Sequence, residues 1–244
     1  FNRNEDCKLL DVVQLSGSLS ITGRSTLTQI EALETKRYFI VGTHTLTLKW
    51  LRLGGADVSG QSGSLSYGGA IYINGAGTLL TIECIFQSNK ARHGGTIYAQ
   101  SGATVRLQHS NMTDNIATAD GGVIYIKDAS SSLYISNSVF TSNESPSGKG
   151  GFCYSSHASL HINDTMITSN NAHRGGGICA DMGILSLHKS EVKSNIATHT
   201  GGGMVIYKGT ATMTDSIIDG NKGFYCGGGI YVEGHNDATG KVIM

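Results

Sequence analysis

This sequence contains very little proline and few charged residues. Its 244 residues include a single proline, Pro146, and only 15% charged residues, against about 25% in an average globular protein. Basic and acidic side chains balance at 18 each. No basic field therefore exists to collect nucleic acid, and we expect no nucleic-acid partner. A chain with so little charge is expected to rely on backbone hydrogen-bond ladders.

Long hydrophobic runs are also missing. No stretch of apolar residues is long enough to cross a bilayer, so we expect no membrane insertion by this segment. The chain opens on Phe1 without an initiator methionine, and residues 241–244 look like the middle of another strand. We therefore expect a processed piece of a longer protein.

Cysteine spacing of the kind that binds zinc is absent as well. The five cysteines include no C-x-x-C pair, which argues against a metal site, and nothing in the sequence indicates a cofactor. Cys84 and Cys153 are expected to face inward. Cys179 is expected to face outward and Cys226 to lie at a corner, and either could bridge Cys7 or another chain. The sequence leaves this pairing open.

What the sequence does contain is a repeat. Glycine pairs begin at seven positions separated by 25 to 29 residues: Gly68, Gly94, Gly121, Gly150, Gly175, Gly201 and Gly227. An asparagine follows each of the first six pairs after 20 to 22 residues: Asn89, Asn115, Asn143, Asn170, Asn195 and Asn221. Two landmarks that recur with one period indicate a solenoid.

Alternating apolar positions between the landmarks predict about three short strands in each repeat. The third residue before each asparagine is apolar, as in Phe86 and Phe140, and the fifth is small, as in Ser110 and Ser138. Both columns should face inward. We predict an all-β, right-handed parallel β-helix of about 26 residues per coil and roughly nine coils. It forms a single domain over 1–244, with irregular starting coils in 1–67 and repeat coils in 68–244.

The landmark residues have a structural explanation in this fold. Glycine accepts positive φ at a sharp corner between closely stacked coils. Asparagine tolerates the left-handed conformation and links its amide to the copies above and below. The six asparagines are therefore predicted to form a structural ladder.

Gly68-Gly69-Ala70-Ile71 followed by Phe86-Gln87-Ser88-Asn89 resembles the repeats of chlamydial polymorphic outer-membrane proteins, marked by Gly-Gly-Ala-Ile and Phe-x-x-Asn. Similar repeats occur in other bacterial and protist surface proteins. The resemblance covers residues 68 to about 232. It implies a β-helical passenger displayed on a surface, often for adhesion, and it does not imply catalysis.

One outward column is rich in tyrosine. The fourth residue after the first glycine of each pair is Tyr72, Tyr98, Tyr125, Tyr154, Cys179, Val205 or Tyr231. A stripe of tyrosines is typical of a contact face for a partner rod, a neighbouring domain or a glycan. The alternative is that tyrosine, a good strand former, stacks on itself.

Three further groups of residues are candidates for glycosylation, metal binding or catalysis. Sequons begin at Asn163, Asn111 and Asn143, of which Asn163 is the favoured glycosylation candidate because Asn143 belongs to the ladder. His173 and His199 occupy matching positions but lack a third metal ligand. Asp164 and Asp215 share a column that elsewhere holds residues of other kinds, as on a solvated face.

These observations favour a non-enzymatic, extracellular module at the cell surface. The leading hypothesis is a structural scaffold of a surface layer or filament that assembles through a side face, with protein partners or further copies of itself. The alternative is an adhesin passenger that binds host cells or glycans. A polysaccharide lyase or hydrolase is less favoured, because clustered acidic residues are not evident.

Overall fold

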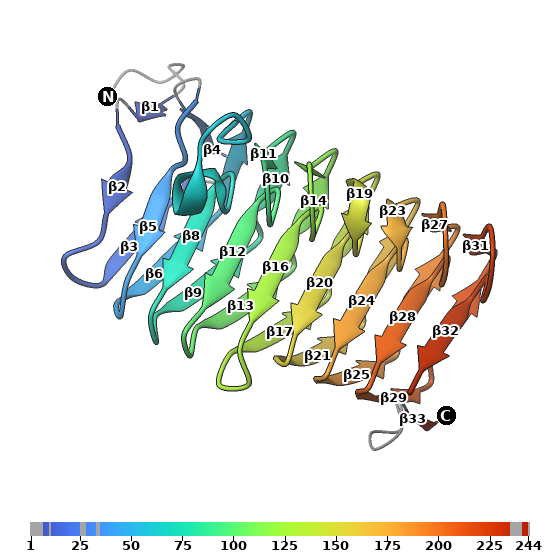
Figure 1. Ribbon diagram of the computed structural model, residues 1–244. Helices are drawn as coiled ribbons and strands as arrows, with labels where there is room; N and C mark the ends of the chain where they lie inside the picture. Colours follow the sequence, from blue (N-terminus) through green and yellow to red (C-terminus); the bar gives the residue numbers. More distant parts are fainter. Residues whose placement is uncertain (1–6, 10, 25–27, 33–34, 235–240, 244) are drawn as a thin grey trace.

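Short parallel strands stack coil upon coil in the computed structural model, which describes residues 7–9, 11–24, 28–32, 35–234 and 241–243 (Figure 1). Successive coils, coloured from blue to red, follow one another along one axis. Each coil passes in turn through three parallel sheets, which we call B, C and A. Later coils also contribute a strand to a fourth sheet, D. All strand pairs are parallel, as in the predicted β-helix.

Sheets B and C contain nine strands each. Sheet B consists of β2 (Val13–Gln14), β5 (Phe39–Val41), β8 (Ile71–Asn74), β12 (Ile97–Gln100), β16 (Ile124–Lys127), β20 (Cys153–Ser156), β24 (Ile178–Asp181), β28 (Met204–Tyr207) and β32 (Ile230–Glu233). Sheet C consists of β3 (Leu19–Thr22), β6 (Thr45–Lys49), β9 (Thr78–Ile82), β13 (Thr104–Gln108), β17 (Ser132–Ser136), β21 (Ser159–Asn163), β25 (Ile184–His188), β29 (Thr210–Thr214) and β33 (Lys241–Ile243).

Sheet A also has nine strands, and sheet D has six. Sheet A consists of β1 (Cys7–Leu9), β4 (Thr28–Ala32), β7 (Leu51–Gly54), β10 (Ile85–Gln87), β14 (Asn111–Thr113), β18 (Val139–Thr141), β22 (Met166–Thr168), β26 (Glu191–Lys193) and β30 (Ile217–Asp219). Sheet D consists of β11 (Lys90–Ala91), β15 (Ile116–Ala117), β19 (Glu144–Lys149), β23 (Asn171–Arg174), β27 (Ile196–Ala197) and β31 (Lys222–Gly223).

Nine strands in each of three sheets agree with the predicted number of coils, but three strands per repeat is wrong. A fourth, mostly very short strand follows each asparagine and builds sheet D. Two-residue strands such as Ile116–Ala117 are too short to show an alternating pattern, which is why the sequence did not reveal them. Pro146 lies in β19, where the register with β23 shifts between Ser145 and Lys149.

The starting coils use the same sheets as the repeats, because β5 pairs with β8 and β7 pairs with β10. The segment between β7 and β8 contains a 3-10 helix, η1 (Gly63–Ser66). Within the described residues, no helix has the length and apolar character needed to cross a bilayer.

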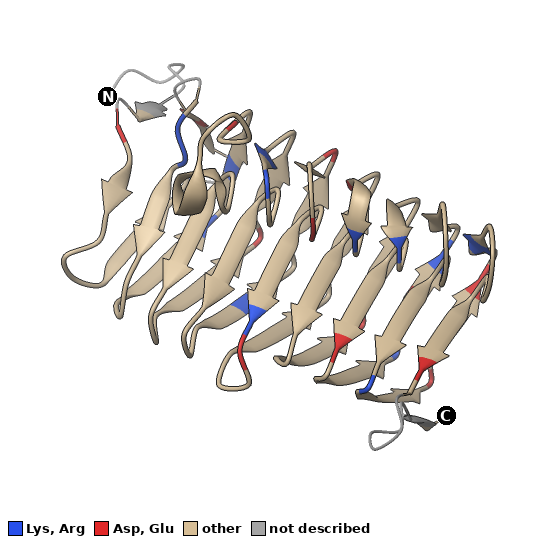
Figure 2. Cartoon of the chain, in the orientation of Figure 1, with Lys and Arg blue, Asp and Glu red and all other residues tan. Residues whose placement is uncertain are grey.

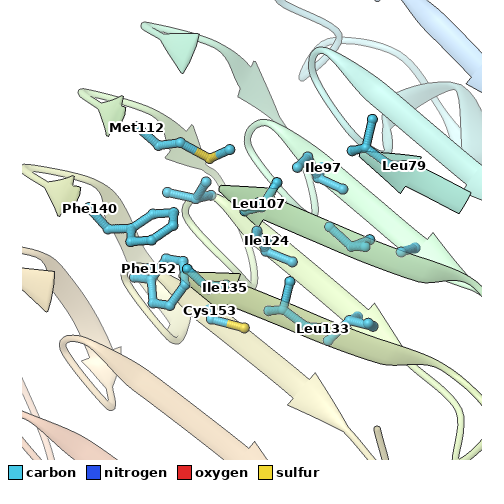
Figure 3. Packing of buried hydrophobic residues seen from close by; sticks show 14 of the residues in the cluster. Leu79, Ile97, Leu107, Met112, Ile124, Leu133, Ile135, Phe140, Phe152 and Cys153 are labelled. Atoms are coloured by element: carbon cyan, nitrogen blue, oxygen red, sulfur yellow. The ribbon is translucent and has the colours of Figure 1, made fainter. Parts of the chain in front are cut away.

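The core is a continuous column of apolar side chains from three sheets. Figure 3 shows Met112 and Phe140 of sheet A facing Leu107 and Leu133 of sheet C across the interior. The Phe140 and Phe152 rings lie 4.1 Å apart between centroids. The inward columns predicted from the alternation are therefore confirmed, since these side chains are fully buried.

Both glycines of a pair are required by close backbone contacts. Gly94 has a φ of +61°, and a Cβ on it would lie 2.1 Å from the carbonyl oxygen of Ile97. A Cβ on Gly95 would lie 2.1 Å from the carbonyl oxygen of Gly122, in the next coil. Real Cβ atoms do not approach backbone so closely, so these corners exclude every other residue type.

The asparagine ladder is continuous over the predicted residues. Asn115 accepts hydrogen bonds at its Oδ1 from the backbone N–H of Asn89 (3.0 Å) and from the side-chain amide of Asn89 (3.1 Å). Its own Nδ2 donates to the carbonyl oxygen of Phe86 and to Oδ1 of Asn143. The pattern repeats along the rod through Asn143, Asn170, Asn195 and Asn221.

The asparagine was predicted to adopt the left-handed conformation at this corner, and that prediction is wrong. The residue before it adopts this conformation. Ser88, Asp114 and Ser142 have φ values of 55°, 55° and 56°. Turning the chain one residue earlier leaves the asparagine side chain directed inward, where its amide meets the buried backbone. A short polar residue or glycine at the preceding position meets the left-handed requirement.

A second ladder, which the sequence did not reveal, is built from hydroxyl groups in the small-residue column. The backbone N–H of Ser110 donates to Oγ of Ser138 (3.1 Å), and that hydroxyl donates to the carbonyl oxygen of Ser136 (2.8 Å). The same arrangement joins Thr165 to Ser190, and Ser190 to Ser216. Small side chains were predicted here, but their polar role follows only from the corner geometry.

Candidate functional site

The tyrosine column lies on the outer side of sheet B, beside a second column that covers part of it. This corner column is defined as the residue before each glycine pair: Tyr67, His93, Asp120, Lys149, Arg174, Thr200 and Cys226. The corner column contacts the tyrosine column of the next coil, since the rings of Tyr67 and Tyr98 are stacked with centroids 4.6 Å apart. We call the tyrosine column and the corner column together the aromatic trough.

The tyrosine column faces away from the main core, as the strand alternation predicts, but most of it is not open to solvent. Tyr154, Cys179 and Val205 form a hydrophobic cluster of their own. Tyr98 is only 4% exposed and Cys179 is fully buried. The expectation of a solvent-facing stripe is therefore wrong for these positions, whereas Tyr125 and Tyr231 are half-buried.

The rings contact one another along the axis of the rod. Tyr72 and Tyr98 lie 5.7 Å apart between ring centroids, Tyr98 and Tyr125 lie 4.8 Å apart, and Tyr125 and Tyr154 lie 5.0 Å apart with parallel planes. Such stacking contributes beyond area burial. The predicted alternative, in which tyrosines stack on themselves, describes this column well.

Charged groups line the trough in matched pairs. Asp120 accepts from the backbone N–H of Lys149 (3.0 Å) and lies 3.4 Å from Nδ1 of His93. Asp181 accepts from the hydroxyl of Tyr154 (3.2 Å) and lies 3.8 Å from Nζ of Lys149. Figure 2 shows the charged residues concentrated at strand ends and corners. Most charges in the trough thus already have a partner.

Arg37, which the sequence analysis did not single out, closes the first coils of the trough. Its guanidinium lies 5.1 Å from the Tyr72 ring centroid and is only 4% exposed. It donates to the carbonyl oxygens of Ser64 and Leu65, both in η1. No spacing rule links Arg37 to the repeat, because it precedes the first glycine pair.

Burial keeps the phenols of the trough in their neutral form. Removal from water raises the pKa of Tyr125 to about 12, and it also raises the pKa of Tyr98 and of Tyr154. The same cause raises the pKa of the Cys179 thiol. These groups therefore donate hydrogen bonds and fill space at neutral pH, and they are not poised as bases or nucleophiles.

The cysteines follow the prediction in part. Cys84 and Cys153 are buried in the main core, and Cys226 is exposed. Cys179 faces outward from that core but is fully buried, so its thiol is not accessible to another chain. All four are free thiols. Of Cys7, only the backbone in β1 is described, so its pairing lies outside the described side chains.

The sequons rank differently in the structure than in the sequence. Asn143 is fully buried, and its amide is used in the ladder, so it is inaccessible in the folded chain. Asn163 is half-buried and donates to Oδ2 of Asp164 (2.5 Å). Asn111 is exposed on β14 and is the most accessible of the three. The order was wrong because Asn111 points outward from sheet A.

The histidine and aspartate candidates remain at corners. The rings of His173 and His199 lie 5.2 Å apart between centroids with their planes tilted, and the ring of Tyr225 lies 4.7 Å beyond His199. Asp164 and Asp215 are exposed residues with positive φ, two coils apart. Over the described ranges, no three His, Cys, Asp or Glu side chains lie close enough to share a metal ion.

Comparison with known proteins agrees with this geometry. A family model described as a right handed beta helix region matches residues 69–241. The chain belongs to this right-handed β-helix family. The match begins at the first glycine pair and runs through the repeat coils. Searches of curated proteins and of solved structures gave no significant match.

Proposed function

We propose that this right-handed β-helix is a rigid scaffold segment of an extracellular surface layer or filament, acting through non-covalent contacts with protein partners or with copies of itself. The observation that supports it is the pair of hydrogen-bonded ladders that run along the rod beside the parallel sheets. From Asn89 to Asn221 successive coils are joined by backbone and amide groups, and most of them also by hydroxyl groups. Such a rod suits a load-bearing spacer.

The aromatic trough supports side-face assembly in a restricted way. Most of its rings are buried in contacts within the chain. A partner would therefore contact the charged residues at its edges and the half-buried Tyr125 and Tyr231. Rim groups such as Lys149 and Asp181 remain partly accessible, with side-chain exposures of 33% and 19%. We expect contacts there to be polar.

An adhesin passenger is the second candidate. It is favoured by the resemblance to chlamydial polymorphic outer-membrane protein repeats and by a hollow on the outer face of sheet C. A polysaccharide-cleaving enzyme has less support, because Asp120 and Asp181 are tied to neighbouring coils and Asp164 and Asp215 have Lys189 between them in their column. Turnover of uronic-acid polymers that disappears with Asp164→Asn would revive it.

Antibodies against the folded rod, applied to intact cells of the source organism, test the scaffold proposal. We expect surface labelling that protease treatment of intact cells removes, and we expect the purified rod to associate in sedimentation at rising concentration. Labelling only after permeabilisation, or a rod that stays monomeric and is absent from isolated surface layers, would contradict the proposal.

A further inference from the structure

A hollow of about 220 Å³ lies on the outward face of sheet C, where β13, β17, β21 and β25 are neighbours (Figure 1). Leu107, Leu133 and Ile135 of these strands point into the core in Figure 3. The alternate residues therefore face outward. They form two parallel rows on successive coils, and the hollow lies between the rows.

The first row is a stack of flat groups. The parallel register aligns Arg106, Tyr134 and His161 on three neighbouring strands. The Arg106 guanidinium lies 4.3 Å from the Tyr134 ring centroid. The Tyr134 and His161 rings are 5.0 Å apart with planes 13° from parallel. Stacking holds the three groups at about the strand spacing.

The stack stops abruptly at the next coil. The residue aligned with His161 is Ser186, and Thr212 follows it. A serine side chain is too short to cover an imidazole face, and His161 is exposed. One position of the stack is therefore vacant, and a ring placed there would continue the stack.

The second row supplies polar groups along the whole hollow, from β13 to β25. Gln108, Ser136, Asn163 and His188 align on successive strands. Among the described residues, no hydrogen bond is made by the side chains of Gln108 and Ser136, and no acceptor pairs with the Arg106 guanidinium. His188 pairs with Oγ1 of Thr214 (2.8 Å) and lies 3.9 Å from Oδ2 of Asp215. Unpaired donors thus surround the hollow at the Arg106 end.

We infer that this hollow binds an anionic oligosaccharide, with one sugar ring in the vacant stack position beside His161 and an acidic group on another unit at Arg106, three strands or about 14 Å away. The stacked ring offers a C–H face to His161 and hydroxyl groups to Ser186, and the units between offer hydroxyl groups to Ser136 and Gln108. A carboxylate or sulfate group is the partner that suits a free guanidinium, which offers paired donors in a planar fork. The site goes beyond the scaffold role and does not depend on it.

The inference is tested by calorimetry on the whole chain with three probes: oligosaccharides of heparin, oligosaccharides of polygalacturonate, and neutral malto-oligosaccharides. We expect an acidic probe to bind at least about tenfold more tightly than the neutral one. Comparing heparin with polygalacturonate shows whether sulfate or carboxylate is preferred. Absence of binding by both acidic probes at millimolar concentration, or equal binding of acidic and neutral probes, overturns the inference.

Variants locate the site. Ser186→Tyr should fill the vacant position with the protein's own ring and abolish binding while leaving Arg106, Tyr134 and His161 in place. Arg106→Gln should weaken the acidic probe at least about tenfold, since a charge-assisted pair is lost. Arg52→Gln, on sheet A, is the control and should bind as the parent chain does. Unchanged binding by Ser186→Tyr, with an unchanged melting temperature, overturns the assignment.

Discussion

Oδ1 of Asn170 accepts two hydrogen bonds from Asn143, one from the backbone N–H (3.0 Å) and one from the side-chain amide (2.9 Å). Asn170 also donates to Oδ1 of Asn195 and to the carbonyl oxygen of Phe140. One fully buried side chain thus links its own coil to polar groups of the coil before it and the coil after it.

Replacing Asn170 by leucine should therefore destabilise the rod strongly. Each buried group left without a partner costs about 1 to 3 kcal/mol, and at least two lose theirs, so we expect about 3 kcal/mol or more. Urea unfolding followed by circular dichroism measures it. Asn111→Leu, at an exposed strand position, is the matched control and should change stability little. Equal losses of unfolding free energy for the two substitutions would contradict the structural role of the ladder.

The glycine corners should tolerate no side chain. Gly95→Ala places a Cβ 2.1 Å from one carbonyl oxygen and 2.7 Å from another, so the coil must shift. We expect a loss of about 3 kcal/mol or more, at the upper end of overpacking costs. Gly60→Ala is the control, because a Cβ there meets nothing within 4 Å. A thermal melt of both variants compares them, and a stable Gly95→Ala chain would show the corner to be looser than described.

The hydroxyl ladder makes a subtler prediction. Ser138→Ala leaves the buried N–H of Ser110 without an acceptor, so we expect a loss of about 1 to 3 kcal/mol. Ser138→Thr should keep most of the stability, because Thr165 occupies the same column in the next coil and makes the same bond to a carbonyl oxygen. Chemical denaturation of the pair gives the comparison. If threonine and alanine behave alike, the hydroxyl is not the stabilising group.

The buried phenols should make the fold sensitive to alkali. Burial raises the pKa of Tyr125 from 10.0 to about 12. Its contribution is fully present below pH 10 and is lost between about pH 10 and 12, because the unfolded chain releases its proton first. The free energy of unfolding should fall with pH in that window, and less steeply in Tyr125→Phe. Near-ultraviolet titration should also show late ionisation of this ring, and equal slopes for parent and variant would contradict the assignment.

The repeat period and the asparagine ladder were predictable because they depend on local chemistry that recurs in the sequence. The burial of Tyr98 and Cys179 was not, because strand alternation tells which side of a sheet a residue occupies and not what covers that side. Tyr67 covers Tyr98, and Cys179 packs in a cluster with Tyr154, whose ring Lys149 overlies; the glycine corners bring Tyr67 and Lys149 to these places. The hollow beside Tyr134 depends on which outward residues align across four coils, and insertions between coils hide that alignment in the sequence.

The asparagine ladder also has a direction. From Asn89 to Asn195, each asparagine donates from its amide to its successor, and Oδ1 of each successor accepts; the parallel strands follow the same sense. A duplicated coil would thus find complementary groups on both sides, and a deleted coil would leave two neighbours that still match. The length of such a rod is free to change through gain or loss of gene segments of one period, without redesign of the coils that remain.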